Sequence, residues 1–265
     1  MWHRSHWALV RQARSLALLT AAVAFAPIMA HADPQGLSVN VPVQVEDAFP
    51  VAFGYLELQG TDRFTRDPHA RSGSDLLALS PTLKLGALPG LQVDLGSSYN
   101  FGNQGSANSA AALDALYNLN NQSTYVPALA MHAYYETPYG AGHKSVRYTL
   151  RGIATKWLGP TDRSPRLHLN LTWYHLTQPS RDQRDDQLEM VLGYSQLVSR
   201  DTALVLDVVH GAKPERGANQ TIVDVGLRHE ISEGWAASLG AGAGIGQQSP
   251  AFRVFFALQR ELRLF

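Results

Sequence analysis

After residue 33, apolar and polar positions alternate with a period of two over segments of about ten residues. In the clearest segment, Leu91 and Leu95 point to one side, and Gln92 and Asp94 point to the other. The same alternation recurs from 167 to 174. A helical period of 3.6 residues fits neither segment. The pattern therefore predicts β-strands that each have one apolar face and one polar face.

The alternating segments and the links between them predict the architecture. We predict strands near 51–60, 75–86, 90–101, 111–120, 124–136, 145–158, 166–176, 187–197, 202–210, 220–231, 235–246 and 251–264. Short and long polar links largely alternate between them, as in bacterial outer-membrane barrels. The predicted fold is an all-β, transmembrane, antiparallel β-barrel of about 12 strands, with both termini in the periplasm.

A soluble β-sandwich or lipocalin-like barrel also has alternating strands, but it needs apolar side chains only for a limited core. Here nearly every strand has a fully apolar face, and the opposite face carries charges and glycines, as Ser238 and Gly240 illustrate. Aromatic residues also collect near strand ends, where membrane interfaces lie. They are Tyr99, Phe101, Tyr134, Tyr135, Trp157, Trp173, Tyr194, Trp235 and Phe252. These features favour the membrane barrel.

Residues 1–32 have the pattern of a secretory signal peptide. Its positive charges are Arg4, Arg11 and Arg14. An uncharged stretch, Leu16–Met29, follows and is short for a membrane anchor. Small residues then predict cleavage after Ala32, which would leave 33–265 as the barrel domain. Within that domain, we expect 33–50 to be a periplasmic lead-in to the first strand.

The last segment alternates from Phe252 towards a final Phe265, which resembles the signal read by the barrel-assembly machinery. In that signal the apolar positions share parity with the last residue, whereas here Arg263 occupies such a position. Two explanations are open: a bulge near Leu262, or a tail that continues past the strand.

Composition narrows the function classes. Acidic and basic side chains number 22 each, and three of the bases lie in the leader, so the remainder is slightly acidic. This gives no electrostatic reason to expect a nucleic-acid partner. Cysteine is absent, which excludes disulfides and thiolate metal sites.

Several segments resemble the outer-membrane family known as the MetA-pathway of phenol degradation, whose members are regarded as transporters. They are Asp47-Ala48-Phe49-Pro50, Val126-Pro127-Ala128-Leu129, Val225-Gly226-Leu227-Arg228 and the Gly-rich 239–246. The resemblance implies a monomeric or weakly associating barrel and passage of small, often hydrophobic or aromatic, molecules. It supplies no binding residues.

Strand parity predicts which charged and polar side chains face the lumen. The candidates are Asp94, Arg147, Arg151, His168, Glu189, Asp207, Asp224, Arg228, Glu230 and Arg253. One interpretation is a narrow polar channel in which Arg147 and Arg151 meet a solute. The other is a cross-strand ion network that plugs the barrel, because Asp224, Arg228 and Glu230 alternate in sign along one strand.

We therefore expect an outer-membrane channel for small molecules, with a non-conducting structural or surface-interaction barrel as the alternative. Outer-membrane lipid hydrolysis is a third candidate, but Ser195 has inward parity, whereas His210 and His229 have outward parity. No His pair has metal-ligand spacing, so neither metal nor cofactor is expected. The basic loops 63–74 and 178–186 are expected to contact lipid and anionic lipopolysaccharide.

Overall fold

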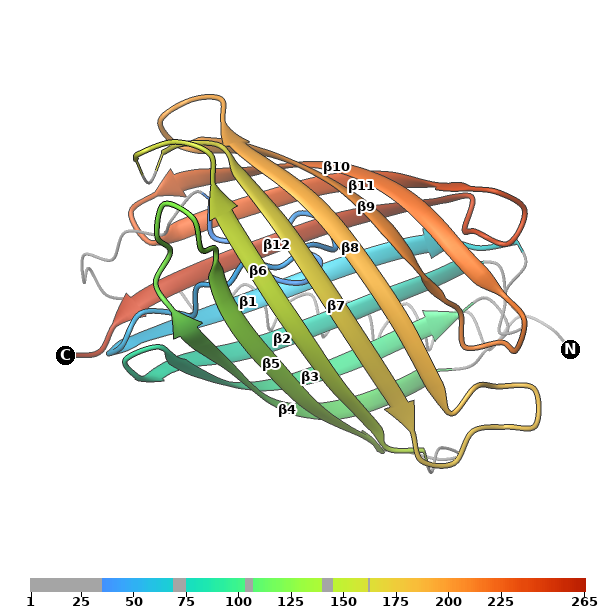
Figure 1. The fold of residues 1–265 in the computed structure, drawn as a ribbon. Coiled ribbons are helices and arrows are strands. Elements are labelled where there is room, and N and C mark those ends of the chain that lie inside the picture. The colour runs from blue at the N-terminus through green and yellow to red at the C-terminus, as the bar shows by residue number, and fades with distance from the viewer. Residues whose placement is uncertain (1–34, 69–74, 103–106, 140–144, 162) are drawn as a thin grey trace, which may run out of the picture.

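A computed structural model describes residues 35–68, 75–102, 107–139, 145–161 and 163–265 of the chain. Within these ranges, twelve antiparallel strands close into one barrel, in which each strand pairs with its sequence neighbours and β1 pairs with β12 (Figure 1). The strands are β1 (Tyr55–Arg66), β2 (Asp75–Leu88), β3 (Leu91–Gly102), β4 (Ala107–Asn120), β5 (Ala128–Tyr139), β6 (Arg147–Trp157), β7 (Arg166–Leu176), β8 (Asp186–Leu197), β9 (Thr202–Ala212), β10 (Asn219–Ser232), β11 (Trp235–Ile245) and β12 (Phe252–Arg263). The predicted all-β, antiparallel barrel of about 12 strands is confirmed, and the periplasmic position of the termini stays a prediction. The expected signal peptide lies outside the described residues. Among those residues, no helix is long and apolar enough to cross a membrane.

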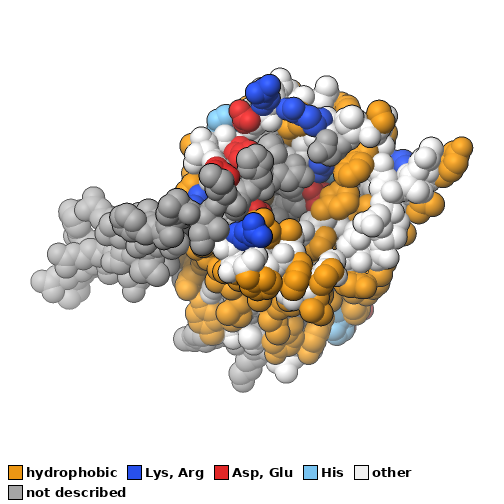
Figure 2. All heavy atoms as spheres, turned by 90° about the vertical axis from the view of Figure 1, so that its left-hand side faces the viewer, with side chains coloured by type: hydrophobic (Ala, Val, Ile, Leu, Met, Phe, Trp, Pro, Cys, Tyr) orange, Lys and Arg blue, Asp and Glu red, His pale blue; other side chains and the backbone are white. Residues whose placement is uncertain are grey.

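The two faces of the strands have the polarity that the alternation predicted. On β3, Leu95 points outward with 62% of its surface exposed, whereas its neighbour Asp94 points inward and is 3% exposed. Hydrophobic side chains gather along the outer wall (Figure 2). Asp62 is exposed on the outer face of β1 and departs from this pattern, and nothing in the described structure explains its position. The barrel is therefore apolar outside, as hydrocarbon requires.

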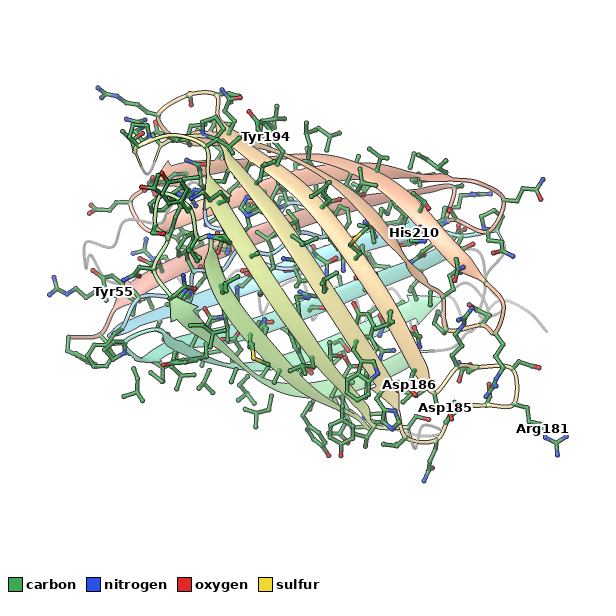
Figure 3. The ribbon with its side chains drawn as sticks, viewed as in Figure 1. Tyr55, Arg181, Asp185, Asp186, Tyr194 and His210 are labelled. Atoms are coloured by element: carbon green, nitrogen blue, oxygen red, sulfur yellow. The ribbon has the colours of Figure 1, made fainter. Side chains whose placement is uncertain are left out.

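Two of the aromatic residues that the sequence analysis assigned to the membrane interface lie inside the barrel instead. Tyr134 points inward and its ring packs on His132 with 3.8 Å between centroids. Trp157 stacks on Phe49 inside the barrel at 5.6 Å. Both residues have inward parity in their strands, and the inner partners explain why they are there. Tyr194 lies close to one end of the barrel, as expected for an interfacial ring (Figure 3).

The first strand begins four residues later than predicted, at Tyr55 rather than at 51. Gly54 precedes it with a φ of 83°, a left-handed conformation that favours glycine. Its neighbour Tyr55 donates a backbone hydrogen bond to the Ala52 carbonyl across this turn. The turn separates β1 from a preceding segment whose alternation is too weak to mark its own boundary.

The C-terminal parity is explained by a tail rather than by a bulge. β12 pairs with β1 in unbroken register from Phe252 to Arg263. Beyond it, the Leu264 N–H donates to the Gly54 carbonyl at 2.8 Å. Phe265 then packs edge-on against Phe53, with 5.5 Å between ring centroids. The last residue therefore lies outside the strand, next to the turn that leads into β1.

The outward polarity predicts a large penalty for a charge near the middle of the wall. Leu239, near the middle of β11, and Ile245, at its end, are 61% and 60% exposed. We expect Leu239→Arg to lower the free energy of unfolding by about 2–4 kcal/mol and Ile245→Arg by about 0–1 kcal/mol. Urea unfolding in lipid vesicles, followed by tryptophan fluorescence, measures both. Equal losses at the two positions would contradict a lipid-facing wall.

Candidate functional site

Residues 35–50, here called the luminal segment, run inside the barrel rather than outside it (Figure 1). Val41, Val43 and Val45 have no exposed surface at all. We expected residues 33–50 to form a periplasmic lead-in. The described residues of that range, 35–50, instead lie inside the barrel. The segment fills much of the space inside the barrel, which the sequence analysis left open between a narrow channel and a plugged lumen.

Inward-facing glycines make room for the luminal segment. A Cβ atom on Gly193 would lie 2.7 Å from a methyl carbon of Val45, and one on Gly226 would lie 2.7 Å from the Cβ of Pro42. A Cβ on Gly240 would lie 2.1 Å from the Pro42 carbonyl oxygen. Such distances are not sterically possible, so the strands approach the segment closely only because these positions lack a side chain.

Strand side chains satisfy the backbone of the segment. The Val45 N–H donates to Asp207 Oδ2 on β9 at 2.7 Å. The Glu46 N–H donates to Asn170 Oδ1 on β7 at 2.8 Å, and Asn170 Nδ2 donates back to the Glu46 carbonyl at 2.8 Å. Asn170 thus pairs with the segment as a neighbouring strand would. Buried backbone groups need such partners, so the contacts hold the segment in one place.

The inner wall is partly apolar, although the alternation predicted a polar inner face on each strand. Two buried clusters join the segment to the strands. The first contains Leu37, Val43, Val45, Val191, Val205, Val209 and Ile222. The second contains Ala48, Leu116, Ala128, Ala130 and Ile153, with Phe49 packed against it. These side chains are shielded by the segment, which explains how apolar residues can occupy inward positions.

A buried ion network fixes the centre of the segment. Glu46 Oε2 accepts from Arg151 Nη1 at 2.7 Å, and Glu46 Oε1 lies 2.9 Å from His132 Nδ1. All three side chains are at most 4% exposed. Burial alone would raise the pKa of Glu46, but the His132 and Arg151 side chains outweigh it and lower the pKa from 4.5 to about 2. Glu46 is therefore held ionised between its two partners.

The predicted lumen-facing residues all have inward parity, but the structure uses them differently. Most are buried: Asp94, Arg151, His168, Asp207, Asp224, Arg228 and Arg253. Glu189 and Glu230 are half-buried, and Arg147 is exposed near the end of β6. Arg151 binds Glu46 rather than standing free for a solute, and Arg147 lies 3.9 Å from Glu136.

The expected ion network exists, although its pairing differs from the pattern along one strand. Asp224 is bound by Arg253 through two hydrogen bonds, one from Nε at 2.8 Å and one from Nη2. Gly242 lies between them, and a Cβ there would overlap Asp224. A second pair joins Lys84 to Glu57 at 3.0 Å. The two-bond pairing of Arg253 with Asp224 fixes the geometry of this part of the inner wall.

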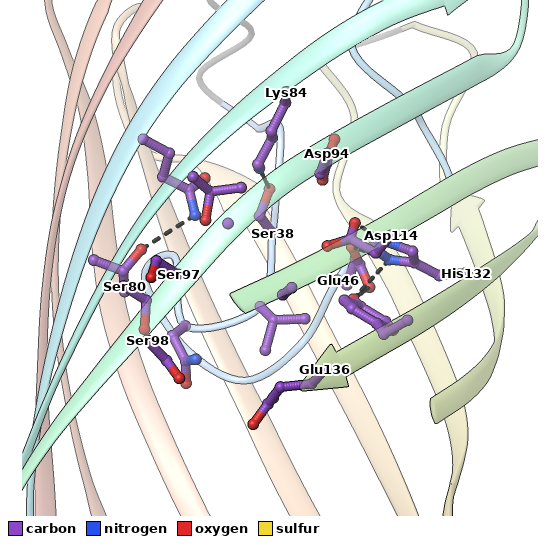
Figure 4. Close-up of a pocket in the computed structure, with 18 residues that line it drawn as sticks. Ser38, Glu46, Ser80, Lys84, Asp94, Ser97, Ser98, Asp114, His132 and Glu136 are labelled. Carbon is purple, nitrogen blue, oxygen red and sulfur yellow. Dashed lines mark hydrogen bonds and ion pairs between the residues drawn. The ribbon is translucent and has the colours of Figure 1, made fainter. Parts of the chain in front are cut away.

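A cavity of about 220 Å³ remains between the luminal segment and the inner faces of β1 to β5 (Figure 4). Its wall is rich in hydroxyl and charged groups. They include Ser80, Thr82, Ser98, Lys84, Asp94 and Asp114. Of the ten predicted lumen-facing residues, Asp94 is the one that lines this cavity. His132 and Asp114 were not named as candidates from the sequence. Both have inward parity within predicted strands, and that parity could have identified them.

The hydrolase alternative is not supported by the arrangement of serine and histidine. Ser195 Oγ lies 3.0 Å from His168 Nε2, and His168 Nδ1 lies 3.1 Å from Thr155 Oγ1. Ser195 and His168 are at most 1% exposed, so their side chains are closed off from solvent. The third member is a hydroxyl rather than an acid. His210 and His229 point outward on other strands, away from Ser195.

The fold defines a class, the closed antiparallel β-barrel with an apolar outer wall. No protein-family model and no curated protein matches the chain. Among solved structures, the chain is similar to a COG4313 outer membrane channel from Pseudomonas putida F1, with 13% identity and a TM-score of 0.63, covering 83% of this chain and 100% of that one. It is also similar to the NanC porin, with 10% identity and a TM-score of 0.56, covering 78% of this chain and 100% of that one. At these identities the likeness shows the fold. The barrel fold is thus confirmed, and the phenol-degradation label stays a prediction.

Proposed function

We propose that this protein is an outer-membrane channel for the passive passage of small, polar molecules. The observation that carries the proposal is the cavity beside the luminal segment, whose wall is lined by side chains such as Ser80, Thr82 and Ser98. Hydroxyl groups can replace the water around a polar solute as it moves. The two similar barrels, a channel and a porin by name, support the same function.

The aromatic or hydrophobic solute implied by the family resemblance finds less support in this wall. Tyr134 is the aromatic residue among the described groups that line the cavity, and its hydroxyl lies 3.3 Å from Glu46 Oε2. Charged groups of both signs, Lys84 and Asp94, face the same space. We therefore favour small hydrophilic solutes. Molecules that are polar at one end only are included among them.

The outer membrane is the proposed location, and its support is the apolar outer wall. The end of the barrel at which β1 begins and β12 ends is proposed to face the periplasm, where Phe265 would have met the assembly machinery. The opposite end carries Arg181 and Asp185 in the loop between β7 and β8 (Figure 3). Arg181 and its basic neighbours are proposed to contact lipopolysaccharide there.

A second candidate, a non-conducting structural barrel, is favoured by the luminal segment itself. The segment is held by buried apolar clusters and by the Glu46–Arg151 pair. A barrel that is filled in this way could serve as a surface scaffold. The two candidates differ in a measurable property, the conductance of the wild-type protein.

Planar-bilayer recordings on the purified barrel test the proposal. The wild-type protein is expected to give small, steady conductance steps. Ser98→Trp places a large ring on the cavity wall and is expected to remove most of that conductance. Leu95→Trp, three residues earlier on the same strand but pointing into lipid, is the matched control and is expected to conduct normally. Wild-type barrels that give neither conductance nor solute-driven swelling of vesicles would overturn the channel and favour the scaffold.

A further inference from the structure

Three potential metal ligands from adjacent strands meet at the cavity wall. They are Asp94 on β3, Asp114 on β4 and His132 on β5, and each offers one ligand atom within 4.8 Å of the other two. All three line the cavity (Figure 4). Asp94 stands directly opposite Asp114 in the strand register. Like charges in that position are destabilising unless a cation lies between them.

One oxygen of this cluster lacks a donor although it is buried. Asp94 is 3% exposed, and its Oδ2 accepts a hydrogen bond from Gln92 Nε2 at 2.7 Å. Its Oδ1 has no hydrogen-bond partner among the described residues. A buried carboxylate oxygen without a partner is rare and needs an explanation, and a bound ion supplies one. Asp94 lines the cavity, so a cation arriving through that space would reach this oxygen.

His132 is oriented as metal-bound histidines are. Its Nδ1 lies 2.9 Å from Glu46 Oε1, so a proton on Nδ1 would be donated to that carboxylate. The other nitrogen, Nε2, then presents its lone pair on the side of Asp114, whose Oδ1 lies 2.8 Å away. A carboxylate behind the imidazole commonly fixes the tautomer of a metal-ligating histidine. Glu46 supplies that carboxylate from the luminal segment.

We propose that Asp94, Asp114 and His132 bind one divalent transition-metal cation, such as Zn²⁺, Co²⁺ or Ni²⁺, at the cavity wall. The charges favour a dication. Glu46 is paired with Arg151, and Lys84, which stands opposite Asp94 in the strand register, has its ammonium group bound to Glu57 at 3.0 Å. When His132 is a neutral imidazole rather than the ion-pair partner of Asp114, the two aspartates are the charges left to neutralise. An imidazole nitrogen in the set favours these metals over Mg²⁺ and Ca²⁺, which prefer oxygen ligands alone.

The site goes beyond the proposed function, because binding requires no transport. Three protein ligands would leave further coordination positions open towards the cavity. Spacing along the chain could not reveal the site, since each ligand comes from a different strand. For that reason the spacing of residues along the chain predicts no metal here.

Cobalt titration of the refolded, detergent-solubilised barrel tests the proposal, with Co²⁺ alone as the probe. We expect one Co²⁺ per barrel, detected by its visible absorption bands and by calorimetry. Asp94→Asn and His132→Gln are each expected to weaken binding by at least tenfold. Heat-modifiable migration on gels checks that each variant has folded, and Asp114→Asn serves as a further variant if one of them does not.

The matched control is a His–Asp pair on the outer surface of the barrel. His175 Nδ1 lies 2.9 Å from Asp186 Oδ1 on the exposed face of β7 and β8. His175→Gln is expected to leave the Co²⁺ signal unchanged. A wild-type barrel that binds no Co²⁺, or a signal that disappears only in His175→Gln, would overturn the site. Neither result bears on conductance, so the channel proposal is tested separately.

Discussion

Deleting residues 35–50 is expected to raise the single-channel conductance several-fold. The deleted luminal segment occupies the space between opposite walls of the barrel, because Glu46 contacts His132 on β5 and Pro42 packs against Gly240 on β11. Without it, ions would cross a wide lumen rather than a cavity of about 220 Å³. Bilayer recordings of the deletion variant beside the wild-type protein measure the change.

A point substitution provides the control for that deletion. Gly240→Val brings a side chain onto the Pro42 carbonyl, where even a Cβ would lie at 2.1 Å, so it should unseat the segment in the full-length chain. Gly152→Val is the matched variant, because a Cβ at Gly152 meets nothing within 4 Å. We expect the first to conduct like the deletion and the second like wild type. Unchanged conductance in a folded deletion variant would mean that the route does not pass through this lumen.

Glu46→Leu is expected to unseat the luminal segment by removing the acid from a buried ion network. The substitution leaves Arg151 and His132 without their shared carboxylate in a site that is almost fully shielded from water. Breaking a buried pair in this way costs about 3–5 kcal/mol. The bound fraction of the segment should fall by orders of magnitude, whereas the strands, which make their own ladder, should stay paired.

A single reporter cysteine measures that release, because the natural chain contains no cysteine. Val43→Cys places the thiol at a position with no exposed surface. Labelling by a water-soluble maleimide should be slow in this background and fast once Glu46→Leu is added. Adding Arg151→Met removes the unpaired cation and should slow labelling again. Equal labelling rates in all three proteins would show that the ion network does not hold the segment.

The barrel wall could be predicted from sequence because its determinants are local. Whether a side chain faces lipid is decided by odd or even position within one strand, as Leu239 and Ser238 show on β11. The boundaries of the strands, in contrast, depend on interactions that are not local. Tyr55 begins β1 only because Gly54 turns the chain away from the luminal segment, and no period-two pattern marks that event.

The site was less predictable, because it is assembled from positions far apart in the chain. Val45 and Asp207, which share a hydrogen bond, are separated by 162 residues. Parity identified Asp94 as inward and would equally have identified Asp114 and His132. It could not identify Glu46, which lies in no strand and is positioned by partners on several of them. The inward-facing glycines could be recognised in the sequence, but the luminal segment that packs against them could not.

The short turn between the luminal segment and β1 has a kinetic consequence. Residues 51–54 tether the segment to the wall, so a displaced segment stays within reach of its binding surface. Short tethers give local concentrations in the millimolar range, so recapture competes strongly with escape. Opening is thus a unimolecular event. The fraction of time that one barrel spends open should not depend on how many barrels share the membrane, and openings should end as brief flickers rather than lasting states.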